Sequence, residues 1–297
     1  MAYLLARLTD TLADAPQVGV GERMECLRQL DSLIQSGGDP EPLQKRLSSE
    51  YVPHHAHTGE QVLLGIVPET LADYRSLPQG EQDLVRLALK EIARGQQLDL
   101  SRFGETSQRR SLATAAELDE YTWLVAGCVG DFWTRTGDEV DPGFFLPGST
   151  LEESCRLGVA YGKGLQLINI IRDAGSDLQE GRCYLPREEM EAAGLELATL
   201  EQEPARFREA WQPWLQRCES GLRSGLEYTT HLRSRRCRLA SGLPALIGLE
   251  TLRAISAADD HQWMSGVKIS RPQVKRLVMK GAVASLRRTG IAKLGHS

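Results

Sequence analysis

Apolar residues recur at intervals of three and four through long stretches of this sequence, and that spacing restricts the fold more than any other feature. The interval matches the α-helix, which has about 3.6 residues per turn. Residues 157–171 show the pattern clearly, and clusters rich in Gly and Pro break the chain between such stretches, as at residues 37–40 and 141–148. Alternating strand patterns are hard to find. The sequence therefore predicts an all-α fold, a helical bundle in a single domain over residues 1–297.

Composition and charge are those of an ordinary globular protein. Hydrophobic residues make up 41% of the chain and charged residues 25%. No apolar run is long enough for a transmembrane helix, and charged side chains interrupt the N-terminal segment that a signal peptide would need. The six cysteines are scattered without metal-ligand spacing, and the net charge of -5 argues against a nucleic-acid partner. We expect a cytoplasmic protein with reduced, mostly buried cysteines and no nucleic-acid partner.

Two aspartates lie four residues apart near the start of the sequence, Asp10 and Asp14, with Arg7 one turn earlier. On a helix the two carboxylates would lie about 40° apart around the axis and would repel each other. A divalent cation between them would remove that repulsion, because Mg²⁺ prefers a few carboxylate oxygens together with water and phosphate. Taken alone, however, such a pair fits a solvated helix end better than it fits a metal site.

A second polar stripe lies in the middle of the chain. Gln166, Asn169, Asp173 and Asp177 recur at helical spacing, whereas the positions between them are mostly Leu and Ile. A helix that is apolar on most sides is buried, so its polar stripe must face a partner or a wet cavity. Two carboxylates and two amides, with Arg172 beside them, fit a metal site better than a structural hydrogen-bond network.

The two acidic motifs belong to a set of sequence blocks. The blocks lie at residues 3–14, 95–100, 121–130, 166–173 and 181–186. In composition, order and approximate spacing they resemble the squalene/phytoene synthase family. Each acidic pair alone is a weak signal, whereas the combination of blocks is specific.

The resemblance implies an isoprenoid-synthase helical bundle with a central apolar cavity and acidic helices at its mouth. It assigns Mg²⁺ binding to Asp10, Asp14, Asp173 and Asp177. Two of these, Asp10 and Asp173, also count as catalytic. It assigns substrate binding to Arg7, Gln166, Asn169, Arg172 and Arg182. The arginines would contact diphosphate oxygens, and the two amides would orient metal-bound water or substrate.

The block that begins at Tyr121 carries small residues, Ala126, Gly127 and Gly130. Small residues at this spacing either permit close helix packing or leave volume for a prenyl chain. The resemblance places Tyr121 beside the reacting carbons as a catalytic residue. A phenol there would stabilise a cation through its π face or take up a proton.

The activity that the resemblance implies is that of a Mg²⁺-dependent farnesyl-diphosphate farnesyltransferase, similar to squalene synthase. Two farnesyl diphosphates would join head to head (1′-1) through presqualene diphosphate, and the reaction would continue to squalene with NADPH. No Gly-rich dinucleotide fingerprint follows a strand in this sequence, so NADPH use rests on the resemblance alone. The nearest alternative is dehydrosqualene or phytoene synthesis without reduction.

Family members usually carry a further helix and a flap before the first aspartate motif. We expect both to be missing here, because Asp10 lies almost at the start of the sequence. An inactive homologue that acts as a binding subunit is therefore an alternative of another class, although the four aspartates oppose it. A terpene cyclase that acts on one diphosphate fits residues 181–186 poorly.

Basic residues concentrate at the C-terminal end of the sequence. Residues 261–297 contain eight Lys or Arg and no Asp or Glu, although the whole chain has a net charge of -5. Ser270 and Pro272 begin an expected helix with one apolar and one basic face. We expect this helix to dock on the body of the protein. Peripheral contact with an anionic membrane is a second use of the same helix.

Overall fold

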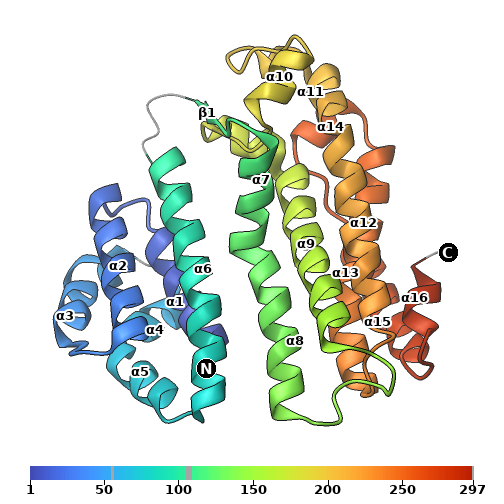
Figure 1. Ribbon diagram of the computed structural model, residues 1–297. Coiled ribbons are helices and arrows are strands. Elements are labelled where there is room, and N and C mark those ends of the chain that lie inside the picture. Colours follow the sequence, from blue (N-terminus) through green and yellow to red (C-terminus); the bar gives the residue numbers. More distant parts are fainter. Residues whose placement is uncertain (55–56, 105–108, 296–297) are drawn as a thin grey trace. The chain divides into compact units, whose positions relative to one another are not determined.

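The computed structural model describes residues 1–54, 57–104 and 109–295, and this part of the chain consists of helices, loops and two short strands (Figure 1). Two compact units divide the chain, Met1–Glu105 and Thr106–Ser297, and each is described by itself. The all-α prediction is confirmed. The single domain and the central apolar cavity stay predictions.

The N-terminal unit is a series of helices with short connections. Its elements are α1 (Ala2–Ala13), α2 (Val20–Ser36), α3 (Glu41–Glu50), the 3-10 turn η1 (Val52–His54), α4 (Thr58–Gly65), α5 (Val67–Arg75) and α6 (Gln79–Phe103). α1 packs against α6 and α2 and buries Leu5, Leu8 and Leu12 completely. Burying each leucine contributes about 1.5–3 kcal/mol. These three residues fix the rotation of α1 and therefore the direction of its aspartates.

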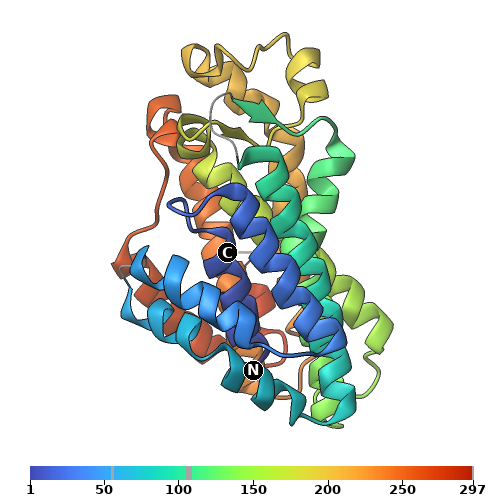
Figure 2. The same cartoon turned by 90° about the vertical axis from the view of Figure 1, so that its left-hand side faces the viewer.

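The C-terminal unit is built around α9. Its elements are β1 (Arg110–Ser111), α7 (Ala115–Thr122), the π-helical turn η2 (Trp123–Gly127), α8 (Cys128–Val140), α9 (Leu151–Gln179), β2 (Arg182–Cys183), α10 (Arg187–Ala192), the 3-10 turn η3 (Leu200–Gln202), α11 (Pro204–Ala210), α12 (Gln212–Tyr228), α13 (Arg235–Ala257), α14 (Asp260–Met264), α15 (Arg271–Ala284) and α16 (Gly290–Leu294). α9 packs against α8, α12 and α13. The strand β1 pairs in parallel with β2, at the same end of the unit as α10 and α11 (Figures 1 and 2).

Small residues let α9 lie unusually close to its neighbours. A Cβ atom added at Gly130 of α8 would lie 2.0 Å from the carbonyl oxygen of Gly158 on α9, and one added at Gly162 would lie 2.2 Å from the carbonyl oxygen of Ala126. No side chain fits at such distances, so these positions require glycine. The small residues that follow Tyr121 therefore serve close helix packing, one of the two uses expected from the sequence.

The described helices also bear on the expectations about membranes and cysteines. Among them, none has both the length and the apolar character needed to cross a bilayer. All six cysteines are free thiols, and five of them are buried. The prediction of mostly buried cysteines outside disulfides therefore agrees with the structure.

Candidate functional site

Asp10 and Asp14 occupy the C-terminal end of α1. The backbone N–H of Asp14 donates to the carbonyl of Asp10 at 2.8 Å, so the two residues are one helical turn apart, as the sequence predicted. Arg23 of α2 donates to the carbonyl of Ala13 at 2.8 Å and caps this helix end. The C-terminal end of a helix carries a partial negative charge. Two carboxylates there are unfavourable unless a cation joins them.

The pKa of Asp10 reflects that electrostatic conflict. Burial raises the pKa of this carboxyl above its usual range, and the neighbouring charge of Asp14 raises it further. A hydrogen bond from Gln96 and the charge of Arg7 act in the opposite direction, but the pKa stays raised. A divalent cation beside Asp10 would favour the ionised form. A perturbed carboxylate of this kind is a candidate functional group.

Gln96 of α6 is the hydrogen-bond partner of Asp10; sequence reasoning noted the block at residues 95–100 that contains it but assigned the residue no role. Its Nε2 donates to Oδ1 of Asp10 at 2.6 Å, while its Oε1 is buried and has no hydrogen-bond partner in the described part of the chain. Such a buried oxygen requires a donor, and metal-bound water would supply one. The available signal was a polar residue on the buried face of α6, between Ile92 and Leu100.

Arg7 lies one turn before Asp10 on α1. Its Nη2 contacts Oε1 of Glu60 on α4 at 2.5 Å, and its side chain is 44% exposed. The ion pair holds the guanidinium without burying it, and exposed pairs of this kind stabilise a fold by only about 0.2–1 kcal/mol. Arg7 can therefore exchange partners at low cost. Its contact with diphosphate stays a prediction.

The predicted polar stripe is present on α9. The apolar residues of this segment, such as Ile168 and Ile171, are buried among the helices of the same unit. Of the polar residues, Gln166, Asp173 and Asp177 are half-buried, and Asn169 is exposed. The stripe is thus on a side of α9 that its neighbours do not fully cover. The roles of these four residues stay predictions.

Each aspartate of α9 contacts an arginine. Arg172 donates from Nε to Oδ1 of Asp173 at 2.8 Å, and its Nη2 bonds to the other carboxylate oxygen. This hydrogen-bonded pair raises the pKa of the Arg172 guanidinium. Nη2 of Arg182 lies 3.2 Å from Oδ1 of Asp177 and 2.5 Å from a carboxylate oxygen of Glu180. The two arginines predicted to bind diphosphate in this unit therefore contact the two aspartates predicted to bind metal.

The turn after α9 places Arg182 beside that helix. Gly181 has a φ of 83°, a left-handed conformation that glycine adopts without strain. Its N–H donates to the carbonyl of Leu178 at 3.1 Å and closes the helix. The chain then reverses into β2, where Arg182 lies opposite Arg110 of β1.

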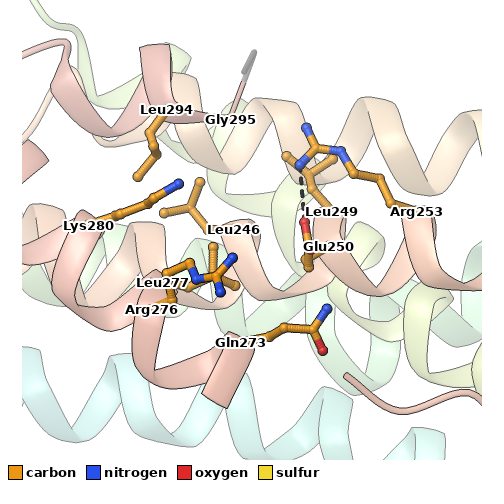
Figure 3. Close-up of a pocket in the computed structure, with 10 residues that line it drawn as sticks. All are labelled: Leu246, Leu249, Glu250, Arg253, Gln273, Arg276, Leu277, Lys280, Leu294 and Gly295. Carbon is orange, nitrogen blue, oxygen red and sulfur yellow. Dashed lines mark hydrogen bonds and ion pairs between the residues drawn. The ribbon is translucent and has the colours of Figure 1, made fainter. Parts of the chain in front are cut away.

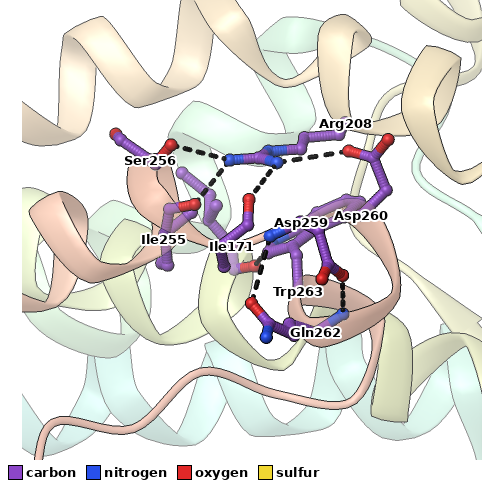
Figure 4. Close-up of polar contacts among 9 residues, drawn as sticks. Ile171, Arg208, Ile255, Ser256, Asp259, Asp260, Gln262 and Trp263 are labelled. Carbon is purple, nitrogen blue, oxygen red and sulfur yellow. Dashed lines mark hydrogen bonds and ion pairs between the residues drawn. The ribbon is translucent and has the colours of Figure 1, made fainter.

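α14 supports the turn of α9 that carries Asp173 (Figure 4). Trp263 is completely buried, and its Nε1 donates to the carbonyl of Ile171 at 3.0 Å. A Cβ atom added at Gly175 would lie 2.0 Å from the carbonyl oxygen of Met264, so the backbones of α9 and α14 are in direct contact. This packing restricts the position of the aspartate-bearing turn.

Arg208 of α11 ties α14 to the end of α13. It donates to the carbonyl of Ala258 at 2.7 Å and to that of Ile255, and its Nη1 lies 3.2 Å from the carboxylate of Asp260 (Figure 4). The guanidinium thus adds hydrogen bonds to carbonyl groups at the end of α13, where regular helical pairing stops. Arg208 thus joins α11, α13 and α14, and α14 in turn contacts α9.

Tyr121, at the end of α7, is paired with a second tyrosine. The rings of Tyr121 and Tyr184 stack with centroids 5.1 Å apart, and the Tyr121 hydroxyl lies 3.4 Å from that of Tyr184. Both side chains are buried. The π-helical turn η2 follows Tyr121 closely, and such turns are frequent at functional sites. Sequence reasoning noted the block that contains Tyr184 but assigned the residue no role.

The oxygen donors fit Mg²⁺. This ion is usually held by one or two carboxylates, with phosphate and water completing its shell. Asp10 with Asp14, and Asp173 with Asp177, each supply such a pair, and Gln96 adds a buried oxygen that has no hydrogen-bond partner among the described residues. Within the described ranges, no three His, Cys, Asp or Glu side chains form a complete metal cage. Because the two pairs belong to different units, their joint action on one substrate stays a prediction.

The helical fold and the two aspartate-bearing helices define an all-α protein with carboxylate pairs suited to a divalent metal. Residues 1–277 match the model of the squalene/phytoene synthase family. The chain belongs to this family. The resemblance noted in the sequence blocks is thereby confirmed.

Individual relatives are similar over shorter segments. The chain is 37% identical over 93 residues to the 15-cis-phytoene synthase of Paracoccus sp., which covers 31% of this chain and 27% of that protein. It is 58% identical over 41 residues to the presqualene diphosphate synthase of Zymomonas mobilis, which covers 14% of each. These alignments span less than a third of either relative's length.

A solved structure shows the fold over almost the whole chain. TcSQS, solved in complex with the ligand E5700, has a TM-score of 0.73 and 22% sequence identity, and the match covers 99% of this chain and 80% of that one. At this level of identity the likeness concerns the fold alone.

Proposed function

We propose that the protein is a Mg²⁺-dependent prenyltransferase that joins two farnesyl diphosphates head to head (1′-1) through presqualene diphosphate. The observation that carries the proposal is the presence of a correctly spaced aspartate pair on each of α1 and α9, in a chain of this family. Similarity to a presqualene diphosphate synthase supports the farnesyl substrate. Continuation to squalene would require hydride from NADPH, a part of the proposal that rests on the family resemblance.

Departure of diphosphate is the step that the aspartates serve. Breaking the allylic C–O bond leaves a carbocation and a diphosphate whose charge must be neutralised. Bound Mg²⁺ would supply that neutralisation. Asp10, Asp14, Asp173 and Asp177 would hold the metal, and the buried Oε1 of Gln96 would accept a hydrogen bond from its water.

The arginines of the site bind diphosphate oxygens. Guanidinium groups match oxyanions in a bidentate manner, and these charge-assisted hydrogen bonds are about twice as strong as neutral ones. Arg172 and Arg182 lie at the aspartates of α9, and Arg7 lies one turn from Asp10. Each exchanges a carboxylate for a phosphate oxygen when substrate binds. The site therefore keeps its arginines in place before the substrate arrives.

The remaining side chains act on the prenyl part of the substrate. The ring face of Tyr121 stabilises the carbocation, and its hydroxyl, which lies beside that of Tyr184, takes up or returns a proton. Gln166 and Asn169 orient the substrate on the exposed side of α9. The cavity that excludes water from the cation is part of the same proposal.

Phytoene synthesis is the second candidate function. The observation that favours it is the longer similarity to a 15-cis-phytoene synthase, 37% identity over 93 residues. That reaction would use the same carboxylates and differ in prenyl chain length and in the absence of reduction. An inactive binding subunit is the third candidate, and the intact aspartate pairs oppose it.

Product identification separates these candidates. The purified protein is incubated with Mg²⁺ and either farnesyl or geranylgeranyl diphosphate, with and without NADPH, and the lipids are analysed by mass spectrometry. We expect presqualene diphosphate from farnesyl diphosphate alone and squalene when NADPH is added. Phytoene from geranylgeranyl diphosphate would establish the second candidate. No diphosphate release under any of these conditions would contradict the enzymatic proposal and favour the binding subunit.

A further inference from the structure

A pocket of about 260 Å³ lies between α13, α15 and α16, among residues of the C-terminal unit that the proposed reaction does not use (Figure 3). Leucines from these helices, including Leu246 and Leu277, form its apolar part. Arg253 of α13 and Arg276 and Lys280 of α15 also line the pocket. The pocket therefore combines an apolar wall with three cationic groups.

The pocket has an excess of positive charge. Arg253 lies 3.1 Å from Glu250, which neutralises it in part. Arg276 and Lys280 have no acidic partner within 4.0 Å among the described residues, and residues 261–297 contain no Asp or Glu. Two unpaired cations beside each other repel, so an anion between them is favourable. The cationic lining of this small pocket therefore suits a phosphate group.

Exposed apolar side chains lie next to these cations on α15. Met279 is 64% exposed, Val283 is 69% exposed, and Leu286, just after the helix, is 60% exposed. At about 100° per residue, Arg276, Met279, Lys280 and Val283 fall within about 100° of one another around the helix. Large apolar side chains that share an exposed face with Lys and Arg are typical of helices that lie in a membrane interface.

We propose that α15 docks on an anionic phospholipid bilayer. A lipid phosphate binds in the pocket between Arg276 and Lys280, while Met279, Val283 and Leu286 enter the boundary between headgroups and acyl chains. Charge selects this face, because the basic residues 261–297 belong to a chain with a net charge of -5. The rest of the protein is acidic and is repelled by the same surface. The docking surface is independent of the proposed reaction.

Electrostatic attraction and apolar insertion both contribute to the predicted binding. Each Lys or Arg near an anionic surface contributes about 1 kcal/mol, and this term weakens as salt is raised. The apolar side chains add a contribution that salt does not screen. At low salt, reversing two charges should therefore weaken vesicle binding more than removing two apolar side chains.

Vesicle flotation of the full chain tests the proposal. Vesicles of phosphatidylcholine alone are compared with vesicles that also contain phosphatidylglycerol, at low and at high salt. We expect the wild-type protein to bind only the anionic vesicles, and Arg276→Glu/Lys280→Glu to reduce that binding at least about tenfold. Met279→Ser/Val283→Ser should reduce the binding that persists at high salt.

A matched charge reversal in the N-terminal unit is the control. Arg28→Glu/Lys45→Glu changes the net charge equally, at residues that are exposed and outside residues 261–297, and should keep wild-type binding within about twofold. Circular dichroism verifies that each variant is folded. The proposal is overturned if the wild-type protein does not bind anionic vesicles at low salt, or if Arg276→Glu/Lys280→Glu binds as well as the control Arg28→Glu/Lys45→Glu. Binding of inorganic phosphate to Arg276 and Lys280 without vesicle binding would also overturn it, because the site would then serve a soluble anion.

Discussion

The two aspartate pairs share a spacing but differ in their surroundings. Asp10 and Asp14 end a 12-residue helix, and Asp10 accepts its hydrogen bond from the neutral amide of Gln96. Asp173 and Asp177 lie late in a 29-residue helix, and each contacts an arginine. Arginine offsets the charge of the α9 pair, whereas Asp10 keeps a raised pKa. The same spacing thus places Asp10 where burial and a neighbouring carboxylate disfavour its ionised form, whereas each aspartate of α9 contacts an arginine.

The largest expected effect comes from removing one carboxylate charge of either pair. Asp10→Asn and Asp173→Asn should each lower turnover at least about a hundredfold, because metal stabilisation of the leaving group amounts to several kcal/mol. Steady-state diphosphate release measures this loss. Glu69→Gln and Glu139→Gln change exposed acids outside the site and should leave turnover near the wild-type value. Near-normal rates in either aspartate variant would remove that pair from the mechanism.

The same two variants should change stability in opposite directions. In EDTA at neutral pH, Asp10→Asn should stabilise the protein, because folding raises the pKa of Asp10 and its ionised form is unfavourable in the folded state. Asp173→Asn should destabilise it, because Arg172 loses a charged partner. Thermal unfolding measures both changes. The gain from Asp10→Asn should shrink as the pH falls below the raised pKa and vanish once Asp10 is also protonated in the unfolded chain, since protonated Asp10 is neutral like asparagine. Shifts of the same sign would contradict the difference between the pairs.

A smaller effect should follow from disturbing the contact between α14 and α9. Gly175→Ala places a Cβ atom against the carbonyl of Met264 and displaces the helix that holds the turn of Asp173. We expect a lower melting temperature and a several-fold higher Mg²⁺ concentration for half-maximal activity. Trp263→Phe removes one hydrogen bond to Ile171 and should cost about 1 kcal/mol of unfolding free energy, with a weaker change in Mg²⁺ requirement.

Gly21→Ala provides the matched control for the α9–α14 contact. Nothing lies within 4 Å of a Cβ atom at Gly21, so this substitution in α2 should leave both the melting temperature and the Mg²⁺ requirement close to the wild-type values. If Gly175→Ala lowers the melting temperature without changing the Mg²⁺ requirement, α14 supports the fold but does not position the aspartates.

The smallest expected effect concerns Gln96. Its hydrogen bond lowers the pKa of Asp10, so Gln96→Leu should raise that pKa further. The acidic limb of the pH–rate profile should move to higher pH, with little change in rate at alkaline pH. Gln97→Leu, one residue along α6, is the control and should keep the wild-type profile. A uniform loss of rate at every pH would show that Gln96 acts otherwise than through Asp10.

Helical periodicity carried the prediction of the fold and of the acidic stripes. The burial of Ile168 and Ile171, and the half-burial of Asp173 and Asp177, follow directly from their spacing on one helix. Such a pattern depends only on local geometry, which a single sequence contains. The small residues around Gly130 left two uses open in the sequence, and the structure shows close helix packing there.

Contacts between distant segments could not be derived in this way. Gln96 meets Asp10 because α6 packs on α1, and Trp263 reaches Ile171 because α14 packs on α9. Neither contact corresponds to a repeating residue pattern in the sequence. The arginine contacts were missed for another reason: Arg172 and Arg182 were assigned to diphosphate, so their contacts with Asp173 and Asp177 were not considered.

The central claim is that both aspartate pairs act on one diphosphate group through bound metal. Calorimetric titration with farnesyl thiodiphosphate, a slowly reacting analogue, in the presence of Mg²⁺ tests it directly in the wild type, Asp10→Asn, Asp173→Asn and the double variant. If one cluster joins the pairs, each single change weakens binding at least about tenfold and the double change adds little. Undiminished affinity in either single variant, or fully additive losses in the double variant, would show that the pairs act separately.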